Sequence, residues 1–159
     1  MTKVIYAGSF DPITNGHIDI VNRAKKLFDE VYIGVIHNPD KQALFTIDER
    51  IQLIQKVFED DSAIVVEGFK GLLVDYARQK NVFTFIRGLR AVSDFDFEFQ
   101  MSHTNRSLES KMETVFLMTD TNYSYLSSSL VKQLASLGGD LKGFVPLHIG
   151  EALGEKYHV

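Results

Sequence analysis

The chain of 159 residues is 45% hydrophobic and 24% charged, ordinary values for a globular protein, and we expect a single domain over residues 1–159. It contains no cysteine, which excludes disulfides, a thiol nucleophile and a cysteine-ligated metal. The net charge of −4 argues against a nucleic-acid partner, because nucleic-acid binding needs a basic face. No apolar run approaches the ~20 residues that span a bilayer. No signal peptide is visible either, so we expect a cytoplasmic protein without membrane contact.

The hydrophobic pattern alternates between short β-branched runs and longer segments with helical spacing, which indicates an α/β fold. The short runs are almost continuously apolar, as strands covered on both faces should be. We therefore expect a Rossmann-like, doubly wound parallel sheet with helices on both faces. Its five expected strands are Val4–Tyr6, Val31–Ile36, Ala63–Glu67, Thr84–Ile86 and Thr114–Leu117.

Helical segments lie between these strands. The sequence "TIDE" predicts a capping box, in which Thr46 caps a helix N-terminus and Glu49 reaches back to the N–H of the cap. Apolar stripes predict further helices around residues 18–28, 73–77 and 130–137, and Gly138-Gly139 would end the last of these.

The segment "DFDFEFQM", Asp94 to Met101, fits two periods. Its strict alternation of polar and apolar residues would by itself indicate a strand. Phe95, Phe99 and Ser102 would also share one helical face, and the βα order of the chain favours a helix at this place. Such a helix would be apolar on nearly all sides and therefore buried, so we expect a homo-oligomer that uses this segment.

Four polar segments lie just beyond the carboxyl ends of expected strands, and they span residues 8–17, 37–41, 87–90 and 121–129. Ligands of an open parallel sheet bind in the crevice outside the carboxyl ends of its strands. We therefore expect these segments to converge on one site.

The first of them, "AGSFDPITNGH", holds more special residues than a turn needs. Gly, Ser, Asp and Pro also punctuate ordinary turns, and for the loop alone this alternative stays open. The functional interpretation is that Gly8 lets the backbone approach a phosphate, to which the Ser9 hydroxyl and the Phe10 N–H donate. His17, in the first turn of the next helix, is either a structural histidine or a donor to a phosphate oxygen.

Cations and hydroxyls recur in the later segments. Lys41, Arg87 and Arg90 are either solvated surface charges or phosphate ligands, a role that suits the planar guanidinium fork. "SSS" at residues 127–129 either caps a helix or supplies hydroxyls and free N–H groups to an anion. Neither a G-x-x-x-x-G-K-[ST] loop nor a G-x-G-x-x-G fingerprint is present, so any phosphates are held in another way. The other histidines lack metal-ligand spacing, and we expect no protein metal site.

"GSFDPITNGH", "IRGLRAVSDF" and "SSSLVK" together resemble the bacterial pantetheine-phosphate adenylyltransferases, over essentially the whole chain and at matching intervals. "TNGH" is similar to the [T/H]-x-G-H signature of the wider nucleotidyltransferase superfamily, and "SSS" stands where that superfamily has its second phosphate-binding motif. The first motif alone supports only the superfamily. Its combination with "RGLRAVSDF" points to the narrower family.

The resemblance implies an enzyme that transfers the adenylyl group of ATP to 4′-phosphopantetheine, giving dephospho-coenzyme A and pyrophosphate. It also implies Mg²⁺ bound mainly through the ATP phosphates, and a homohexamer. We expect direct in-line attack without a covalent intermediate, because the attacking phosphate is already an anion. The alternatives are a related nucleotidyltransferase with a different phosphorylated acceptor, or a non-catalytic nucleotide-binding module.

The same resemblance assigns roles to individual residues. The expected catalytic residues are His17, Lys41 and Arg87. Phosphopantetheine is expected to contact Ser9, Lys41, Leu73 and Arg87. ATP is expected to contact Ser9, Phe10, His17, Gly88, Leu89, Arg90, Glu98, Tyr123, Ser124, Tyr125, Leu126, Ser127, Ser128 and Ser129. Two positions depart from the family pattern: Ser9 replaces a common Thr and keeps the hydroxyl, whereas Phe97 replaces a common Tyr and loses the phenol.

Overall fold

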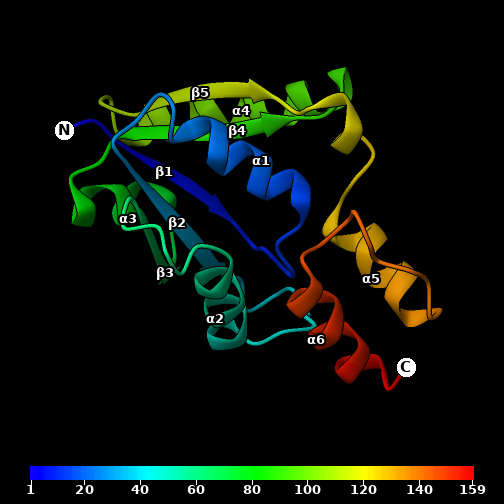
Figure 1. The fold of residues 1–159 in the computed structure, drawn as a ribbon. Helices are drawn as coiled ribbons and strands as arrows, with labels where there is room; N and C mark the ends of the chain where they lie inside the picture. Colours follow the sequence, from blue (N-terminus) through cyan, green and yellow to red (C-terminus); the bar gives the residue numbers. More distant parts are fainter.

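In the computed structural model, which covers residues 1–159, all the strands lie parallel in one sheet (Figure 1). Their order across the sheet is β3-β2-β1-β4-β5, so the chain builds from β1 to one edge and then returns to build the other half. This is a doubly wound, Rossmann-like topology, and it confirms the fold class expected from the hydrophobic pattern. The strands are β1 (Lys3–Gly8), β2 (Glu30–His37), β3 (Ile64–Lys70), β4 (Thr84–Leu89) and β5 (Glu113–Met118).

Helices connect or follow these strands (Figure 1). They are α1 (Asn15–Ala24), α2 (Ile47–Val57), α3 (Leu73–Lys80), α4 (Val92–Leu108), the 3-10 helix η1 (Thr121–Tyr123), α5 (Ser128–Ser136) and α6 (Leu147–Tyr157). None of them is long and apolar enough to cross a membrane.

The side chains of β1 alternate between two hydrophobic cores, one on each face of the sheet. Val4 and Tyr6 belong to the larger core, which α1, α2, α5 and α6 complete. Ile5 and Ala7 belong to the smaller core, which the buried face of α3 completes. Helices on both faces therefore explain why the strands read as continuous apolar runs.

The expected strands are all present, and their observed ends differ from the expected ones by at most three residues. β4 runs on to Leu89 because its pairing with β5 continues to the register Leu89↔Met118. The first helix is shorter than expected, since α1 ends at Ala24. Phe28 lies in the following turn, where its N–H still donates to the Ala24 carbonyl and its ring packs against the larger core.

Helix termini follow local chemistry. Thr46 and Glu49 form the expected capping box, with N–H donation from Thr46 to Glu49 Oε2 over 2.8 Å and from Glu49 to Thr46 Oγ1 over 3.2 Å. Gly138, two residues after α5, adopts a φ of +72°, a left-handed conformation typical of a helix stop. The sequence did not predict α6, whose internal Gly150 and Gly154 weaken its helical pattern.

The Phe-rich segment is helical, because it lies within α4. The βα order of the chain therefore outweighed the strict alternation of its residues. The helix is not buried within the chain, as Glu98 is its sole buried residue. Phe95, Phe97 and Phe99 are 43%, 60% and 50% exposed, and they present an apolar surface to solvent.

Candidate active site

A pocket of about 310 Å³ lies at the carboxyl ends of β1 and β4, where the strand order reverses. This is the crevice that the topology makes available to a ligand. Three of the four expected segments, residues 8–17, 87–90 and 121–129, contribute to it, whereas no residue of the segment 37–41 lines it. The expected site residues that line it are Ser9, Phe10, His17, Arg87, Gly88, Arg90, Glu98, Tyr123, Leu126, Ser127 and Ser128.

His17 is held by a capping interaction at the start of α1. The Thr14 N–H donates to His17 Nδ1 over 3.0 Å, and the Thr14 hydroxyl lies 3.2 Å from the same nitrogen. Burial, together with the positive charges of Arg90 and Arg87, lowers the pKa of His17 to about 4. The ring is therefore neutral at pH 7. Because Nδ1 accepts a hydrogen bond, Nε2 carries the proton and is a hydrogen-bond donor.

Two aromatic rings support His17. Phe10 contacts the His17 ring edge to face with centroids 5.1 Å apart, and Tyr6 contacts Phe10 in the same manner over 5.2 Å. Phe10 adopts a φ of 46°, in the left-handed region that bulky side chains avoid. Such a conformation costs about 1–3 kcal/mol. It persists only where the surrounding structure enforces it, and it is common at binding sites. The loop is thus held in a strained conformation beside the histidine.

Arg87 at the end of β4 is engaged on two sides. Its Nε and Nη2 donate to the two carboxylate oxygens of Glu98 over 2.8 and 2.6 Å, and its Nη1 donates to the Ala7 carbonyl over 2.8 Å. Burial works to lower the pKa of Arg87, but the hydrogen bonds and charge of Glu98 outweigh it and raise the pKa. The fork therefore has a fixed orientation at the floor of the pocket.

Arg90 bridges two walls of the pocket. Its Nη1 donates to the Leu126 carbonyl over 3.1 Å, and its Nε donates to Asp94 Oδ2 over 3.4 Å. The segment before α5 is thereby tied to the loop that follows β4. Both arginines retain donor hydrogens that no protein group uses, which suits an anionic ligand.

The serine run has a structural role and also lines the pocket. Ser127 is the N-cap of α5, accepting from the Leu130 N–H over 3.1 Å. The Ser128 hydroxyl donates to the Pro12 carbonyl over 2.7 Å, which joins α5 to the β1–α1 loop. Ser129 is exposed. The N-terminus of a helix therefore opens beside the pocket, a favourable place for a phosphate.

Some expected site residues do not line this pocket. Lys41 is exposed in the loop after β2, and Leu73 is half-buried at the start of α3. Leu89, the last residue of β4, is buried. Ser124 donates to the Thr121 carbonyl, and exposed Tyr125 packs edge to face on Phe144. Ser129, as noted, faces solvent. The roles expected for all of these residues stay predictions.

Other residues that line the pocket were not anticipated from the sequence. The sequence offered a signal for Thr14, because the spacing Thr-x-x-His resembles a capping box with His17 in place of Glu. Asp94 carried a weaker one, as it lies four residues after Arg90. For Tyr6 and Thr119 the sequence offered no signal, since their position in the pocket depends on strand pairing.

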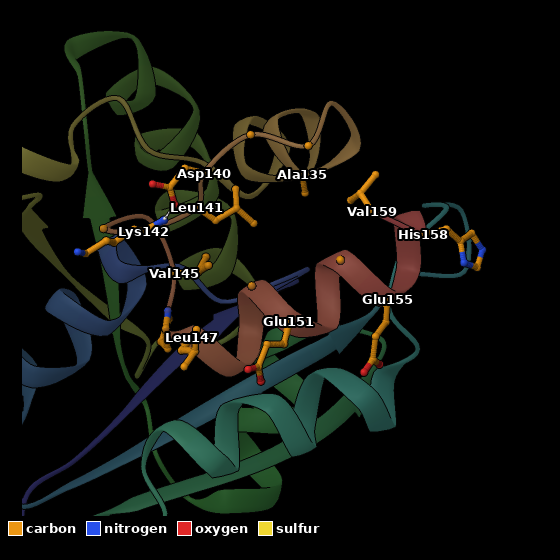
Figure 2. Close-up of a pocket in the computed structure, with 16 residues that line it drawn as sticks. Ala135, Asp140, Leu141, Lys142, Val145, Leu147, Glu151, Glu155, His158 and Val159 are labelled. Atoms are coloured by element: carbon orange, nitrogen blue, oxygen red, sulfur yellow. Dashed lines mark hydrogen bonds between the residues drawn. The ribbon is translucent and has the colours of Figure 1, made fainter.

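A larger cavity of about 1300 Å³ lies between the end of α5 and helix α6 (Figure 2). None of the expected site residues lines it. Its lining is rich in glycine and carries Glu151 and Glu155 on α6, and it lacks the arginines and the histidine of the smaller pocket. The smaller pocket is therefore the candidate active site.

Comparison with known proteins shows the family to which the chain belongs. A model of the cytidylyltransferase-like family matches residues 5–134, which run from within β1 to near the end of α5 and include every residue that lines the pocket. Among solved structures, nicotinic acid mononucleotide adenylyltransferase of Plasmodium falciparum, complexed with NaAD, has a TM-score of 0.73 at 16% identity. The match covers 100% of this chain and 97% of that one. At this identity the likeness shows a shared fold.

Curated relatives are much more similar. The phosphopantetheine adenylyltransferase of Clostridium novyi is 56% identical over 92% of this chain and 91% of its own length. That of Synechococcus elongatus is 51% identical over 98% and 94%, and that of Dictyoglomus thermophilum is 50% identical over 100% and 97%. The chain therefore belongs to the cytidylyltransferase-like family and, within it, to the phosphopantetheine adenylyltransferases.

Proposed function

We propose that this chain transfers the adenylyl group of ATP to 4′-phosphopantetheine, giving dephospho-coenzyme A and pyrophosphate in the biosynthesis of coenzyme A. One observation carries the proposal. In a chain of this family, the pocket brings a neutral histidine donor, two oriented arginines and a helix N-terminus to the switch point of the sheet. These groups suit two phosphorylated substrates. A cytoplasmic location stays a prediction.

The reaction we propose is a single displacement. A phosphate oxygen of phosphopantetheine attacks the α-phosphorus of ATP, and the bond from that phosphorus to the bridging oxygen of the β-phosphate breaks, releasing pyrophosphate. The nucleophile is already an anion, so no general base is required. The protein has to position two polyanions and to neutralise the charge that develops between them. The Nε2 proton of His17 is available to donate to an oxygen on the α-phosphate.

In this proposal the two arginines bind different substrates. We propose that Arg87, with Lys41 and Ser9, binds the phosphate of phosphopantetheine and that Leu73 lines its pantetheine arm. We propose that Phe10, His17 and the backbone and side chains of residues 88–90 and 123–129 bind ATP. Glu98 would act partly by orienting Arg87, since it accepts hydrogen bonds from Nε and Nη2 along one edge of the guanidinium and so fixes the direction of the remaining N–H groups.

We propose Mg²⁺ as the metal that accompanies ATP. Asp94 and Glu98, the carboxylates that line the pocket, are paired with Arg90 and Arg87. Mg²⁺ commonly takes most of its ligands from substrate phosphates and water, and this is the arrangement we propose. When bound, the ion would neutralise charge on the ATP phosphates. Chelation with EDTA should abolish turnover, and added Mg²⁺ should restore it.

We also propose a homohexamer that uses the exposed face of α4. Phe95 and Phe99 contact each other with centroids 5.6 Å apart, and on another face of the helix Phe97 and Met101 are 60% and 39% exposed. Several large apolar side chains exposed on one helix are typical of a protein–protein interface. Family membership supports the same assembly only by resemblance. Sedimentation at micromolar concentration measures it directly.

Product analysis tests the activity. The protein is mixed with ATP, Mg²⁺ and 4′-phosphopantetheine, and dephospho-coenzyme A is sought by mass together with released pyrophosphate. Nicotinate mononucleotide and glycerol phosphate serve as competing acceptors. Faster turnover with either of them would reassign the acceptor. ATP binding without pyrophosphate release, whatever the acceptor, would instead indicate a non-catalytic nucleotide-binding module.

A further inference from the structure

We propose that Asp11 is a positioning residue, whose buried carboxylate anchors the loop that carries Lys41 beside the active site. The inference rests on the proposed function, in which Lys41 binds the phosphate of the acceptor. Asp11 does not line the pocket itself. It would act on the reaction through the loop that it holds.

Three separate segments meet at the Asp11 side chain, which is 6% exposed. The Leu44 N–H donates to Oδ2 and the Phe45 N–H to Oδ1, each over 2.9 Å. Lys132 of α5 donates from Nζ to Oδ2, also over 2.9 Å. One carboxylate in the β1–α1 loop thus ties down the β2–α2 loop and is itself held by α5.

Little else holds the part of the Lys41 loop that precedes Leu44. Residues 38–43 are all exposed. Their hydrogen bonds are local, from the Asp40 N–H to Asn38 Oδ1 and from the Lys41 N–H to the Asn38 carbonyl. After Lys41, the first attachments to the rest of the protein come three and four residues further along: the two hydrogen bonds to Asp11 and the burial of the Phe45 side chain in the larger core. Those bonds therefore limit how far the Lys41 ammonium can move from the pocket.

The anchor depends on the negative charge of Asp11. Burial works to raise the pKa of this carboxyl, but the Phe45 and Leu44 N–H groups and the Lys132 ammonium outweigh it and lower the pKa. A carboxylate accepts all three donors with two oxygens. An asparagine in its place would have one acceptor oxygen and would turn an NH₂ group toward a donor. Asp11→Asn should therefore lose the hydrogen bond to at least one of the three donors.

A different residue holds the strand ends from which these two loops leave the sheet. Arg50 is buried, and its Nη1 donates to the Ser9 carbonyl over 2.7 Å and to the Ile36 carbonyl over 3.2 Å. These bonds keep the ends of β1 and β2 together without Asp11. Loss of the Asp11 charge should consequently weaken binding of the acceptor much more than binding of ATP.

Steady-state kinetics on the full-length protein test this separation. We expect Asp11→Asn to raise KM for 4′-phosphopantetheine by about 10-fold while KM for ATP changes less than about threefold. Lys132→Met should raise the same KM by less, and Lys132→Arg should restore it. Lys25→Met is the matched control, because it removes another partly exposed ion pair, with Asp61, from the opposite end of α1. It should change neither KM.

A double-mutant cycle tests whether Asp11 acts through Lys41. If it does, Asp11→Asn should add little to KM for phosphopantetheine once Lys41 is alanine, since residues that act as a unit are not additive. Fully additive effects, or equal rises in KM for both substrates, would overturn the proposal. If Asp11→Asn does not fold, the cycle with Lys132→Met decides in the same way.

Amide hydrogen exchange separates this proposal from the proposed function. We expect faster exchange at Leu44 and Phe45 in Asp11→Asn, and unchanged exchange there in Lys25→Met. Unchanged exchange in Asp11→Asn would overturn the anchoring role whether or not the enzyme is active. A wild-type protein that forms no dephospho-coenzyme A would overturn the proposed function and leave the exchange data to decide the role of Asp11.

Discussion

His17 shows how local contacts set the chemistry of one residue. The Thr14 N–H fixes the tautomer, Phe10 fixes the plane of the ring, and burial keeps the ring neutral. A neutral ring with its proton on Nε2 is a preorganised donor that needs no reorganisation during the reaction. His17 can therefore both take part in the cap of α1 and act as a donor to a substrate.

We expect His17→Ala to lower kcat by about 10²–10³-fold, the usual loss when one preorganised donor to a developing negative charge is removed. KM for ATP should change much less, because the donor acts mainly in the transition state. Steady-state kinetics with both substrates measure this. Near-normal turnover in the variant would contradict a catalytic role for His17.

The pKa of His17 also predicts a pH dependence of stability. In the unfolded chain the imidazole titrates near pH 6.5, and in the folded protein near pH 4. Between these values the unfolded state binds the extra proton, so the contribution of His17 to stability is complete above pH 6.5 and is lost as the pH falls toward 4. Denaturant unfolding across this range should show a smaller loss of stability for His17→Gln than for the wild type.

At the scale of the element, helix α1 connects capping to catalysis. Its N-cap Thr14 bonds the backbone N–H of His17 and also the His17 ring, so one residue both starts the helix and orients the donor. Helix α2 begins with a similar capping box at Thr46, whose partner Glu49 lies outside the pocket. The two helices therefore offer a matched pair of substitutions.

Thr14→Ala and Thr46→Ala should each cost about 1 kcal/mol of stability, the usual loss of an N-cap side chain. Only Thr14→Ala should also lower kcat, by about tenfold, because the His17 ring loses the hydroxyl beside Nδ1. Thermal unfolding and kinetics on both variants measure the two effects. Equal activities in the two variants would show that Thr14 caps the helix and does no more.

The sequence predicted correctly those elements whose formation depends on residues close together in the chain. The strands, the capping box at Thr46 and the stop at Gly138 were predicted because apolar runs, cap chemistry and glycine act over a few residues. Helix α6 was missed because its apolar stripe is interrupted by glycines, and packing on α5 and the larger core supplies what propensity lacks.

At the scale of the whole molecule, α4 faces both the active site and solvent. Glu98 points inward to Arg87, while Phe97, one residue earlier, is 60% exposed. A helix with a weak amphipathic pattern is the expected outcome when both of its faces are to be covered, one by the chain and one by another subunit. The surface that we propose for assembly therefore lies on the same helix that orients Arg87.

We expect Phe97→Glu to dissociate the assembly into smaller species, because it places a charge in an apolar interface. Leu137→Glu is the control, as Leu137 is 78% exposed at the end of α5 and lies far along the chain from α4. It should leave the assembly intact. Sedimentation velocity measures both, and a wild-type monomer at micromolar concentration would contradict the proposed interface.

The sequence by itself determined the βα alternation, the strands and the location of the polar segments at their carboxyl ends, because hydrophobic periodicity and turn chemistry are local. Only the tertiary structure decided which of these groups meet. Arg87 pairs with Glu98 eleven residues away, and Asp11 pairs with Lys132 across 121 residues. Such partners depend on strand order and on how the helices cross the sheet. Burial among these partners keeps His17 neutral and Asp11 charged, and no local sequence pattern encodes it.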